Sequence, residues 1–333
     1  MATIYEVAAA AGVAPSTVSR ALRHSTRISE RTIGRIEQVA AELNYVPKYA
    51  AQALAGSSVQ TLAMVLPRIA GSYYADLAVG FETHASELDF SVIMLQADSA
   101  RDRSRTVRRL IGQADAVAFL AKSAADDRLV QQVAASRPVV TVARTALPGI
   151  PALYSESTES AHKLTKHLIQ QGRRRIAFVG PLDEGSDIAA RHEGFTRALR
   201  GAGLRIPKAL TVSMDEQSGR QLARRLHIEG LPFDALVCGS DEIAIATLDE
   251  LQRLGAVVPD DVAIVGWDDV QTARYLRPGL TTVKQPVTEL GALAVETLHR
   301  LLQGQDVEQR ITLGTTIMHR QSCGCTSANS EHN

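Results

Sequence analysis

Several polar and aromatic residues stand where short apolar segments end, and their side chains suit the binding of a polyhydroxylated small molecule. Asp268 follows the apolar segment Ile264–Gly266, Ser240 follows an earlier one, and Tyr73 and Tyr74 come after the first. Carboxylates make strong hydrogen bonds with neighbouring hydroxyls, and an aromatic ring can pack against the apolar face of a sugar. These residues therefore predict a site for a small polar ligand.

Arg191 adds a guanidinium to this set, in the segment Arg191-x-x-Gly194-Phe195. A planar guanidinium can bind two oxygens at once, which suits paired hydroxyls. Structural roles compete with this interpretation. An aspartate at the end of a strand often caps the following helix, which is the role we expect for Asp241. Tyr73 and Trp267 could equally fill a core.

The other reactive residues form no pattern that predicts catalysis or a metal centre. No Gly-x-Gly-x-x-Gly follows an apolar segment, and no Ser-His-Asp or paired-carboxylate arrangement stands out. Cys323 and Cys325 could bind a metal, but a single Cys-x-Cys without other ligands is usually a pair of terminal thiols. We expect surface or packing roles for His162, His167 and His192. We therefore predict a protein that is not an enzyme and has no cofactor and no metal.

These residues must be positioned by alternating strands and helices, which recur from Thr61 onward. The predicted strands are Leu62–Leu66, Ser91–Leu95, Ala116–Leu120, Val139–Val142, Ile176–Val179, Leu210–Val212, Ala235–Cys238 and Val262–Val265. The predicted helices include Ala75–Leu88, Ser157–Gln171, Arg191–Ala202, Gly219–Glu229 and Glu242–Leu254. Such alternation is typical of doubly wound parallel α/β sheets, and so many strands predict two lobes that divide near residues 155–160. Ligands bind such folds beyond the carboxyl ends of strands, in a crevice.

The first sixty residues have a different organisation. Thr3-Ile4-Tyr5-Glu6 has the form of a capping box, and Gly12 permits a tight turn after the helix that follows. Pro15 is tolerated only in the first turn of a second helix, and Ser29 can cap a third that runs to Asn44. This arrangement predicts a helix-turn-helix whose second helix enters the major groove of DNA. A helical dimerisation module would fit the same spacing.

Composition and charge set further limits. The 333 residues are 45% hydrophobic with a formal net charge of zero, which is typical of two or three globular units. Residues 1–58 hold six basic and four acidic residues, a net charge of +2 that a dimer would double. The sequence has no secretory signal, no long apolar segment and no disulfide framework among its three cysteines. We therefore expect a cytoplasmic protein with no membrane association.

The N-terminal segment resembles the lactose/galactose repressor (LacI/GalR) family of bacterial transcription regulators. The resemblance rests on Ile4–Ala8, Ala11–Val13, Thr17–Leu22 and Leu43–Pro47, in this order and with these gaps. It implies base contacts from Pro15, Ser16 and Arg20, and phosphate contacts or packing from Thr3, Tyr5, Thr17 and Ser19.

Two details of this segment adjust the expected DNA contacts. Arg20 could bind a guanine through both arms of its guanidinium, a contact worth about 1–3 kcal/mol of discrimination. Ala14 stands where the family usually has a capping serine, so the cap of the recognition helix is weakened, and Pro15 partly compensates by fixing φ. Direct reading of bases then depends more on Ser16 and Arg20.

Residues 47–58 are Ala-rich and, taken alone, form a linker or a marginal helix. The resemblance implies a hinge that folds on operator DNA and inserts Leu54 into the minor groove. Lys48 and Gln52 stand where asparagine and arginine are common in the family, so one phosphate contact of this segment, to which Lys48 belongs, is expected to be moved or lost.

The resemblance extends over the rest of the chain through Gly172–Phe178, Pro259–Val262, Gly266–Asp269 and Leu280–Pro286. It implies that Arg191 and Asp268 bind the effector, that Tyr73 and Tyr74 stand at the entrance, and that Gln285 lies at a crossover between the lobes. Ser240 replaces a frequent asparagine, and Arg144 follows Ala143 where many members have an aspartate. These departures make an acidic or phosphorylated sugar a further hypothesis.

Together these observations predict a repressor of carbohydrate-utilisation genes whose operator affinity is controlled by a sugar-like effector. The expected domains are a helix-turn-helix over 1–46, a hinge over 47–58 and a two-lobed effector-binding and dimerisation domain over 59–333. The expected partners are double-stranded operator DNA, a small-molecule effector and a second copy, in a homodimer or a tetramer. A sugar-binding protein without a DNA-binding role is the alternative. The effector, the target genes and the sign of control stay open.

Overall fold

The computed structural model describes residues 2–22, 28–45, 60–67, 71–96, 112–121, 126–182 and 187–325. The chain forms two compact units, residues 1–60 and 61–333. The predicted hinge over 47–58, with Lys48 and Leu54, lies outside the described residues. No helix within the described ranges is long and apolar enough to cross a membrane.

The first unit contains three helices, α1 (Ile4–Ala11), α2 (Pro15–Ala21) and α3 (Glu30–Glu42). The capping box predicted at the start of α1 is present, and Gly12 ends that helix at a φ of 63°. Ala14 occupies the N-cap of α2 without a side-chain hydrogen bond. The buried side chains of this unit are Val7, Ala8, Ala11, Val18, Ala21, Ile36 and Ala40.

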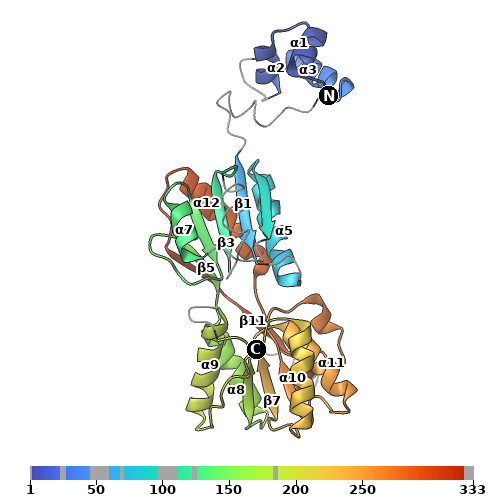
Figure 1. The fold of residues 1–333 in the computed structure, drawn as a ribbon, viewed down its shortest axis with the longest axis vertical. Coiled ribbons are helices and arrows are strands. Elements are labelled where there is room, and N and C mark those ends of the chain that lie inside the picture. The colour runs from blue at the N-terminus through green and yellow to red at the C-terminus, as the bar shows by residue number, and fades with distance from the viewer. Residues whose placement is uncertain are drawn as a thin grey trace. The chain divides into compact units, whose positions relative to one another are not determined.

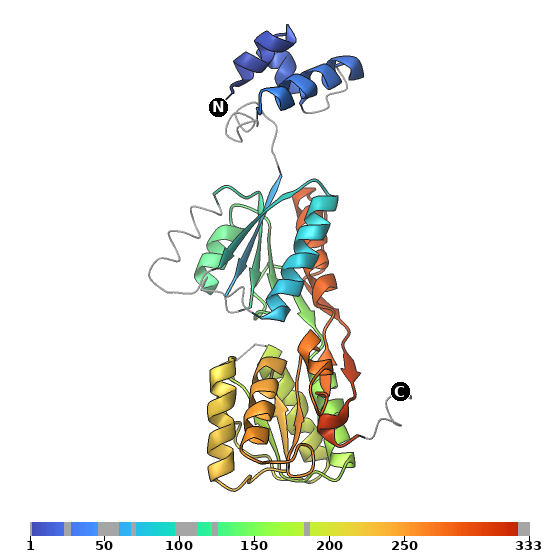
Figure 2. The ribbon, with the colours of Figure 1, turned by 90° about the vertical axis from the view of Figure 1, so that its right-hand side faces the viewer.

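The first lobe of the second unit is a six-stranded sheet in the order β10-β5-β4-β3-β1-β2. Every neighbouring pair is parallel, as for Leu62 of β1 opposite Val92 of β2 and Ala116 of β3. Its strands are β1 (Thr61–Leu66), β2 (Ser91–Gln96), β3 (Ala116–Leu120), β4 (Val139–Val142), β5 (Ala152–Ser155) and β10 (Arg310–Leu313). Helices α5 (Ser72–Glu87) and α12 (Val287–Leu302) contribute to the core on one face, and α7 (Asp127–Ala134) to the core on the other. The helices are labelled in Figure 1, and Figure 2 shows the two faces of the sheet from the side.

The second lobe has a three-stranded parallel sheet of β6 (Ile176–Val179), β7 (Ala235–Cys238) and β8 (Ala263–Val265). The helices α8 (Thr158–Gln170) and α9 (Asp187–Gly201) pack in one core, and α10 (Glu216–Ile228) and α11 (Asp241–Arg253) in the other. The central strands of both lobes are buried along their whole length, as expected for sheets covered on both faces (Figure 2).

The chain passes between the lobes three times. The first passage, between β5 and α8, falls where the sequence predicts the division at 155–160. The chain returns between β9 (Thr282–Lys284) and α12, and leaves again between β10 and β11 (Thr316–Met318), which pairs with β9 antiparallel. The short 3-10 helices η1 (Gln271–Arg274) and η2 (Gln321–Cys323) complete the second lobe.

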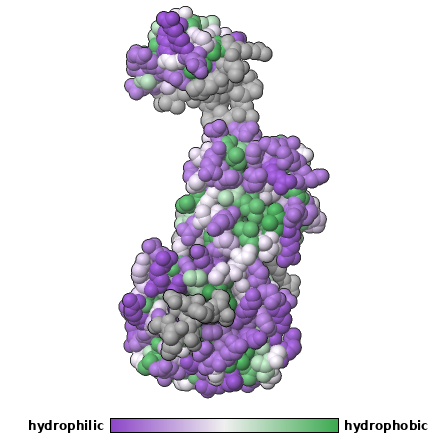
Figure 3. Space-filling view, turned by 180° about the vertical axis from the view of Figure 1, so that it is seen from behind, coloured by the Kyte–Doolittle hydropathy of each residue, from purple (hydrophilic) through white to green (hydrophobic). Residues whose placement is uncertain are grey.

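Glycines allow the closest contact between two helices of the first lobe. A Cβ at Gly80 of α5 would overlap the carbonyl group of Thr288, and one at Gly291 of α12 would overlap the carbonyl oxygen of Leu77. Any larger residue at either position must therefore push α5 and α12 apart. On the face shown in Figure 3, apolar side chains gather on the first lobe, whereas the second lobe is mostly hydrophilic.

The predicted strand Leu210–Val212 is wrong in extent, because only Leu210 pairs, in an isolated bridge to Val179. Strands β5, β9, β10 and β11 and helices α7 and α12 were not predicted. The strands have only three or four residues each, and β10 and β11 alternate charged or polar residues with apolar ones. Strands β10 and β11 therefore lack the continuous apolar character used to identify the others.

Candidate functional site

A cavity of about 720 Å³ is lined by residues of both lobes in the second unit. Its volume lies within the range of small-molecule sites. All seven side chains predicted to bind the effector lie on its wall, namely Tyr73, Tyr74, Arg144, Arg191, Ser240, Asp268 and Gln285. The structure thus brings together residues more than 200 positions apart in the chain. Their role in binding remains a prediction.

Arg191, Asp268 and Gln285 form the polar centre of this wall. The Arg191 side chain, 5% exposed, donates a hydrogen bond to the Gly239 carbonyl and lies with its Cζ 4.5 Å from the centre of the Trp267 ring. The Gln285 Nε2 donates to the Asp268 Oδ1 over 2.6 Å. Within the described residues, the buried Arg191 Nε and Gln285 Oε1 have no hydrogen-bond partner. Arg191 and Gln285 thus each keep one unused hydrogen-bonding atom in residues that line the cavity.

Burial is the largest influence on the pKa values of Asp268 and Asp187, two carboxylic acids in the cavity. It raises the pKa of Asp268 to about 7, although the Arg191 guanidinium lowers that pKa in part. Burial also raises the pKa of Asp187, the first residue of α9, although the Arg191 guanidinium lowers that pKa in part. A ligand that donates hydroxyls would favour the ionised form of Asp268, so its binding would release a proton near neutral pH.

Three strands end at the cavity in residues with positive φ. Ala121 follows β3 with a φ of 44°, Ala143 follows β4 with 51°, and Asp268 follows β8 with 125°. Residues with a side chain adopt this region rarely, and such conformations persist where the surrounding structure holds them. The backbone thus turns sharply at the carboxyl ends of these strands, where ligands of doubly wound folds bind.

The aromatic pair is placed by the first turn of α5. The rings of Tyr73 and Tyr74 meet edge to face with centroids 5.2 Å apart. Burial, and then the charge of Asp187, raise the pKa of Tyr73 well above its ordinary value. Tyr73 therefore stays a neutral hydroxyl that can donate or accept a hydrogen bond.

Arg144 already has a charged partner inside the protein. Its guanidinium forms an ion pair with Asp127 at 2.6 Å, and its other arm lies 3.3 Å from the Ala121 carbonyl oxygen. The Tyr154 hydroxyl donates to the Arg144 carbonyl, which fixes the backbone after β4. The positive charge that suggested an acidic ligand is therefore balanced by the first residue of α7.

The expected capping role of Asp241 is wrong, whereas Trp267 occupies the core position that the sequence left open. Asp241 does not cap α11. The N-cap is Ser240, whose hydroxyl accepts from the Ile243 amide, while the buried Asp241 carboxylate accepts from the Thr282 hydroxyl and the Val270 amide. Trp267 does not line the cavity. It is 1% exposed within the second-lobe core and reaches the cavity only by supporting Arg191.

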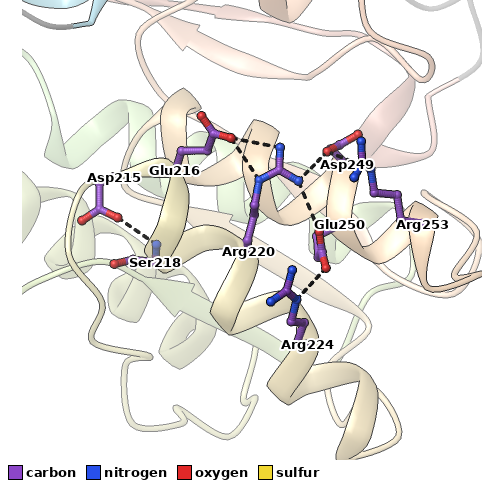
Figure 4. A network of polar contacts seen from close by, with 8 residues as sticks. All are labelled: Asp215, Glu216, Ser218, Arg220, Arg224, Asp249, Glu250 and Arg253. Atoms are coloured by element: carbon purple, nitrogen blue, oxygen red, sulfur yellow. Dashed lines mark hydrogen bonds and ion pairs between the residues drawn. The ribbon is translucent and has the colours of Figure 1, made fainter.

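Sequence reasoning missed the charged residues that α9, α10 and α11 bring to the cavity, namely Asp187, Glu216, Arg220, Glu242 and Asp249. Figure 4 shows the Arg220 side chain between α10 and α11. Its guanidinium lies 2.8 Å from Asp249, 2.9 Å from Glu216 and 3.2 Å from Glu250. These carboxylates raise the pKa of Arg220 above its ordinary value. The spacing of Glu216 and Arg220 at i and i+4 was the available signal, but it does not reveal the pairing with α11.

In the first unit, the predicted DNA-contacting residues differ in exposure. Ser16 and Arg20 of α2 are exposed, and Tyr5 of α1 is 72% exposed although it is a large aromatic residue. The Thr3 hydroxyl is engaged with the Glu6 carboxylate in the capping box. Pro15, Thr17 and Ser19 are partly buried. The exposed set can contact DNA without any change in the helices.

A helical DNA-reading unit and a two-lobed α/β unit with a ligand-sized cavity together define a DNA-binding regulator that responds to an effector. Known families match both parts. The family "Bacterial regulatory proteins, lacI family" matches residues 3–48, and the "Periplasmic binding protein-like domain" matches residues 165–323.

Individual relatives match nearly the whole chain. The ribose operon repressor of Escherichia coli (strain K12) is 31% identical over 330 residues, which cover 97% of this chain and 100% of that one. The lac repressor dimer bound to operator and the anti-inducer ONPF matches with a TM-score of 0.85 and 26% identity, over 97% and 99%. The complex of the transcriptional regulator CelR with cellobiose matches with a TM-score of 0.71 and 28% identity, over 97% and 100%.

The chain belongs to the LacI family of bacterial regulatory proteins. It is thus a DNA-binding transcription regulator and not an enzyme, and its second unit is a periplasmic-binding-protein-like effector domain.

Proposed function

We propose that the protein represses carbohydrate-utilisation genes and that an uncharged sugar, bound in the cavity of the second unit, releases it from its operator. The observation that carries the proposal is the polar centre of the cavity. There, Arg191 and Gln285 each keep a buried hydrogen-bonding atom without a partner among the described residues, beside the Asp268 carboxylate. Sugar hydroxyls both donate and accept hydrogen bonds, so they match this mixed set.

The charge of the cavity favours a neutral ligand over a phosphorylated one. Five carboxylates line it (Asp187, Glu216, Glu242, Asp249 and Asp268) against three guanidinium groups (Arg144, Arg191 and Arg220). Arg144 is paired with Asp127, and Arg220 with three carboxylates. A phosphate group would therefore approach Arg191 alone, in a field dominated by negative charge. Among the solved relatives, CelR is bound to the neutral disaccharide cellobiose.

The DNA-reading part of the proposal uses residues 1–46. Ser16 and Arg20 would contact base edges, with Pro15 beside them, while Thr3, Tyr5, Thr17 and Ser19 would contact phosphates or pack. Residues 47–58 would form the hinge, with Leu54 in the minor groove and Lys48 at a phosphate. Two copies would place one α2 helix in each half of a palindromic operator.

Coupling between the two functions would run through the lobes of residues 59–333. The chain crosses between the lobes three times, so a ligand that contacts both lobes changes the angle between them. That change would separate the two hinges of a homodimer and lower the affinity for DNA, with reciprocal linkage between sugar and operator. A DNA-binding regulator of this kind would act in the cytoplasm.

The test measures operator affinity by fluorescence anisotropy, with the full-length protein and a fragment of the DNA upstream of its own gene. We expect specific binding that weakens steeply as salt rises. Ribose or cellobiose should release the DNA, whereas ribose 5-phosphate should not. A stronger response to the phosphate would contradict the neutral ligand, and tighter binding with sugar would reverse the sign of control.

The same measurement distinguishes a sugar-binding protein that does not read DNA. Such a protein would bind a sugar in calorimetry but would show equal affinity for operator and scrambled DNA at every salt concentration. The homodimer is tested separately by light scattering. A monomer at concentrations where the operator is bound would contradict the dimeric arrangement, and a tetramer would extend it.

A further inference from the structure

Two histidines and two cysteines meet in the second lobe, away from the residues that line the effector cavity. His167 lies on α8, His319 follows β11, and Cys323 and Cys325 lie at the end of the described chain. The His167 Nε2 is 3.4 Å from the Cys323 Sγ and 3.0 Å from the Cys325 Sγ, and the two sulfurs are 2.8 Å apart. One ligand atom each from His167, His319 and Cys325 lies within 4.8 Å of the others.

We propose that these four side chains form a tetrahedral Zn²⁺ site that fastens the C-terminal segment to α8. Zinc–sulfur bonds of about 2.3 Å and zinc–nitrogen bonds of about 2.0–2.1 Å place tetrahedral ligand atoms about 3.3–3.8 Å apart. The distances among His167, Cys323 and Cys325 lie within about 1 Å of these separations. The His319 imidazole lies within 4.8 Å of the ligand atoms of His167 and Cys325, so a change in its side-chain torsions must bring it closer to complete the site.

A second observation that favours a bound ion is an unpartnered nitrogen atom in the cluster. The His319 Nδ1 is buried and has no hydrogen-bond partner in the described chain. The imidazole rings of His167 and His319 are tilted by 56° to each other, with their centroids 4.4 Å apart. Neutral imidazoles and thiolates are the forms that bind zinc.

Charge balance favours the same ion. Binding displaces one proton from each of the two thiols, and Zn²⁺ with two thiolates and two neutral imidazoles has no net charge. A half-buried site therefore holds the complex without an unpaired charge. A disulfide between Cys323 and Cys325 would use neither imidazole and would leave the His319 nitrogen without a partner.

The surrounding structure holds the ligands and leaves a path for the ion. The Ser322 hydroxyl donates to the Ile264 carbonyl at 2.5 Å and accepts from the Thr281 amide at 2.8 Å, which fixes η2 against β8. These bonds hold the backbone on either side of Ser322, from which the neighbouring Cys323 side chain extends. Cys323 and Cys325 also line a hollow of about 340 Å³ at the edge of the lobe. The sequence does not predict this site, because His167 is more than 150 positions from its partners.

The test uses full-length protein purified under reducing conditions without chelator. Elemental analysis should give one zinc per chain, and replacement by Co²⁺ should produce the visible absorption of a tetrahedral thiolate complex. Cys325→Ser and His319→Gln should each weaken zinc binding by more than about 100-fold, since loss of a supporting residue alone costs about 10–100-fold. Cys238→Ala removes the third cysteine, which is buried on β7 outside the cluster, and should keep full occupancy.

Three results would overturn the site. The wild-type protein could fail to bind zinc or cobalt. Both variants could bind zinc as tightly as the wild type while their circular dichroism stays native. The protein isolated under reducing conditions could contain a Cys323–Cys325 disulfide, detected as the loss of two hydrogens in its mass, which would assign the pair to thiol redox chemistry instead.

Discussion

The two units of the molecule present their predicted recognition residues in opposite ways. In the first unit, Ser16, Arg20 and Tyr5 are exposed on two short helices. In the second unit, Arg191 and Gln285 are buried and come from segments almost 100 residues apart. An exposed residue can be replaced with little effect on the fold, whereas a buried charge influences protonation, packing and binding together. Four substitutions test this difference.

The largest effect is expected for Arg191→Ala. Truncation of this guanidinium leaves Asp268 and Asp187 without the cation that favours their ionised forms. Loss of a charged hydrogen bond to the ligand costs about 1.5–3 kcal/mol, which is roughly 10- to 100-fold in affinity. Calorimetry with the sugar that releases the operator should show this loss. Arg200→Ala, exposed near the end of the same helix, is the matched control, and an equal loss there would contradict the assignment.

Arg20→Ala should weaken operator binding by about 1–3 kcal/mol while leaving the fold unchanged, because the side chain is exposed. The reduced affinity should be specific to the operator. Anisotropy on scrambled DNA separates the two possible roles, because a phosphate contact would weaken binding to both sequences equally. Equal weakening would move Arg20 from base recognition to the DNA backbone.

The pH dependence of sugar binding should follow Asp268, whose pKa burial raises to about 7. Below that pH the carboxylate is protonated and accepts hydroxyls poorly, so affinity should fall by up to about tenfold per pH unit. The free energy of unfolding of the protein without sugar changes with pH in the opposite direction. The folded state retains a proton that the unfolded chain has lost, so the free energy of unfolding decreases as pH rises from about 4 to about 7. Asp268→Asn should remove most of the slope in affinity. If sugar affinity depends on pH as steeply in this variant as in the wild type, the titrating group is Asp187 or Asp241 instead.

The smallest effect is expected for Ala14→Ser. Ala14 is the N-cap of α2 and makes no side-chain hydrogen bond, so a serine hydroxyl can satisfy a free amide of the first turn. Hydrogen exchange of the α2 amides in the full-length chain measures this effect. It does not require the first unit to fold on its own. We expect a stabilisation of about 0.5–1 kcal/mol, and no gain would mean that Pro15 already fixes the helix start.

The same contrast explains how much could be predicted from the sequence. In the first unit, the capping box at Thr3 and Glu6 and the turn at Gly12 are local patterns, and both are present. In the second unit, the seven predicted residues reach one cavity because parallel strands bring their carboxyl ends together. The pairing of Arg144 with Asp127 depends on tertiary contacts between segments, and so does the role of Asp241 beside Thr282. Local pattern cannot reveal either.

The three passages of the chain between the lobes have a consequence for synthesis on the ribosome. The first sheet begins with β1 at Thr61, but the core on one of its faces is incomplete until α12 ends at Leu302. At about 5–20 residues per second, the ribosome needs roughly 10–50 s to make the intervening chain. During that time the nascent sheet exposes an apolar face. The DNA-reading helices are finished first, so each molecule acquires its reader well before it acquires the sensor that controls it.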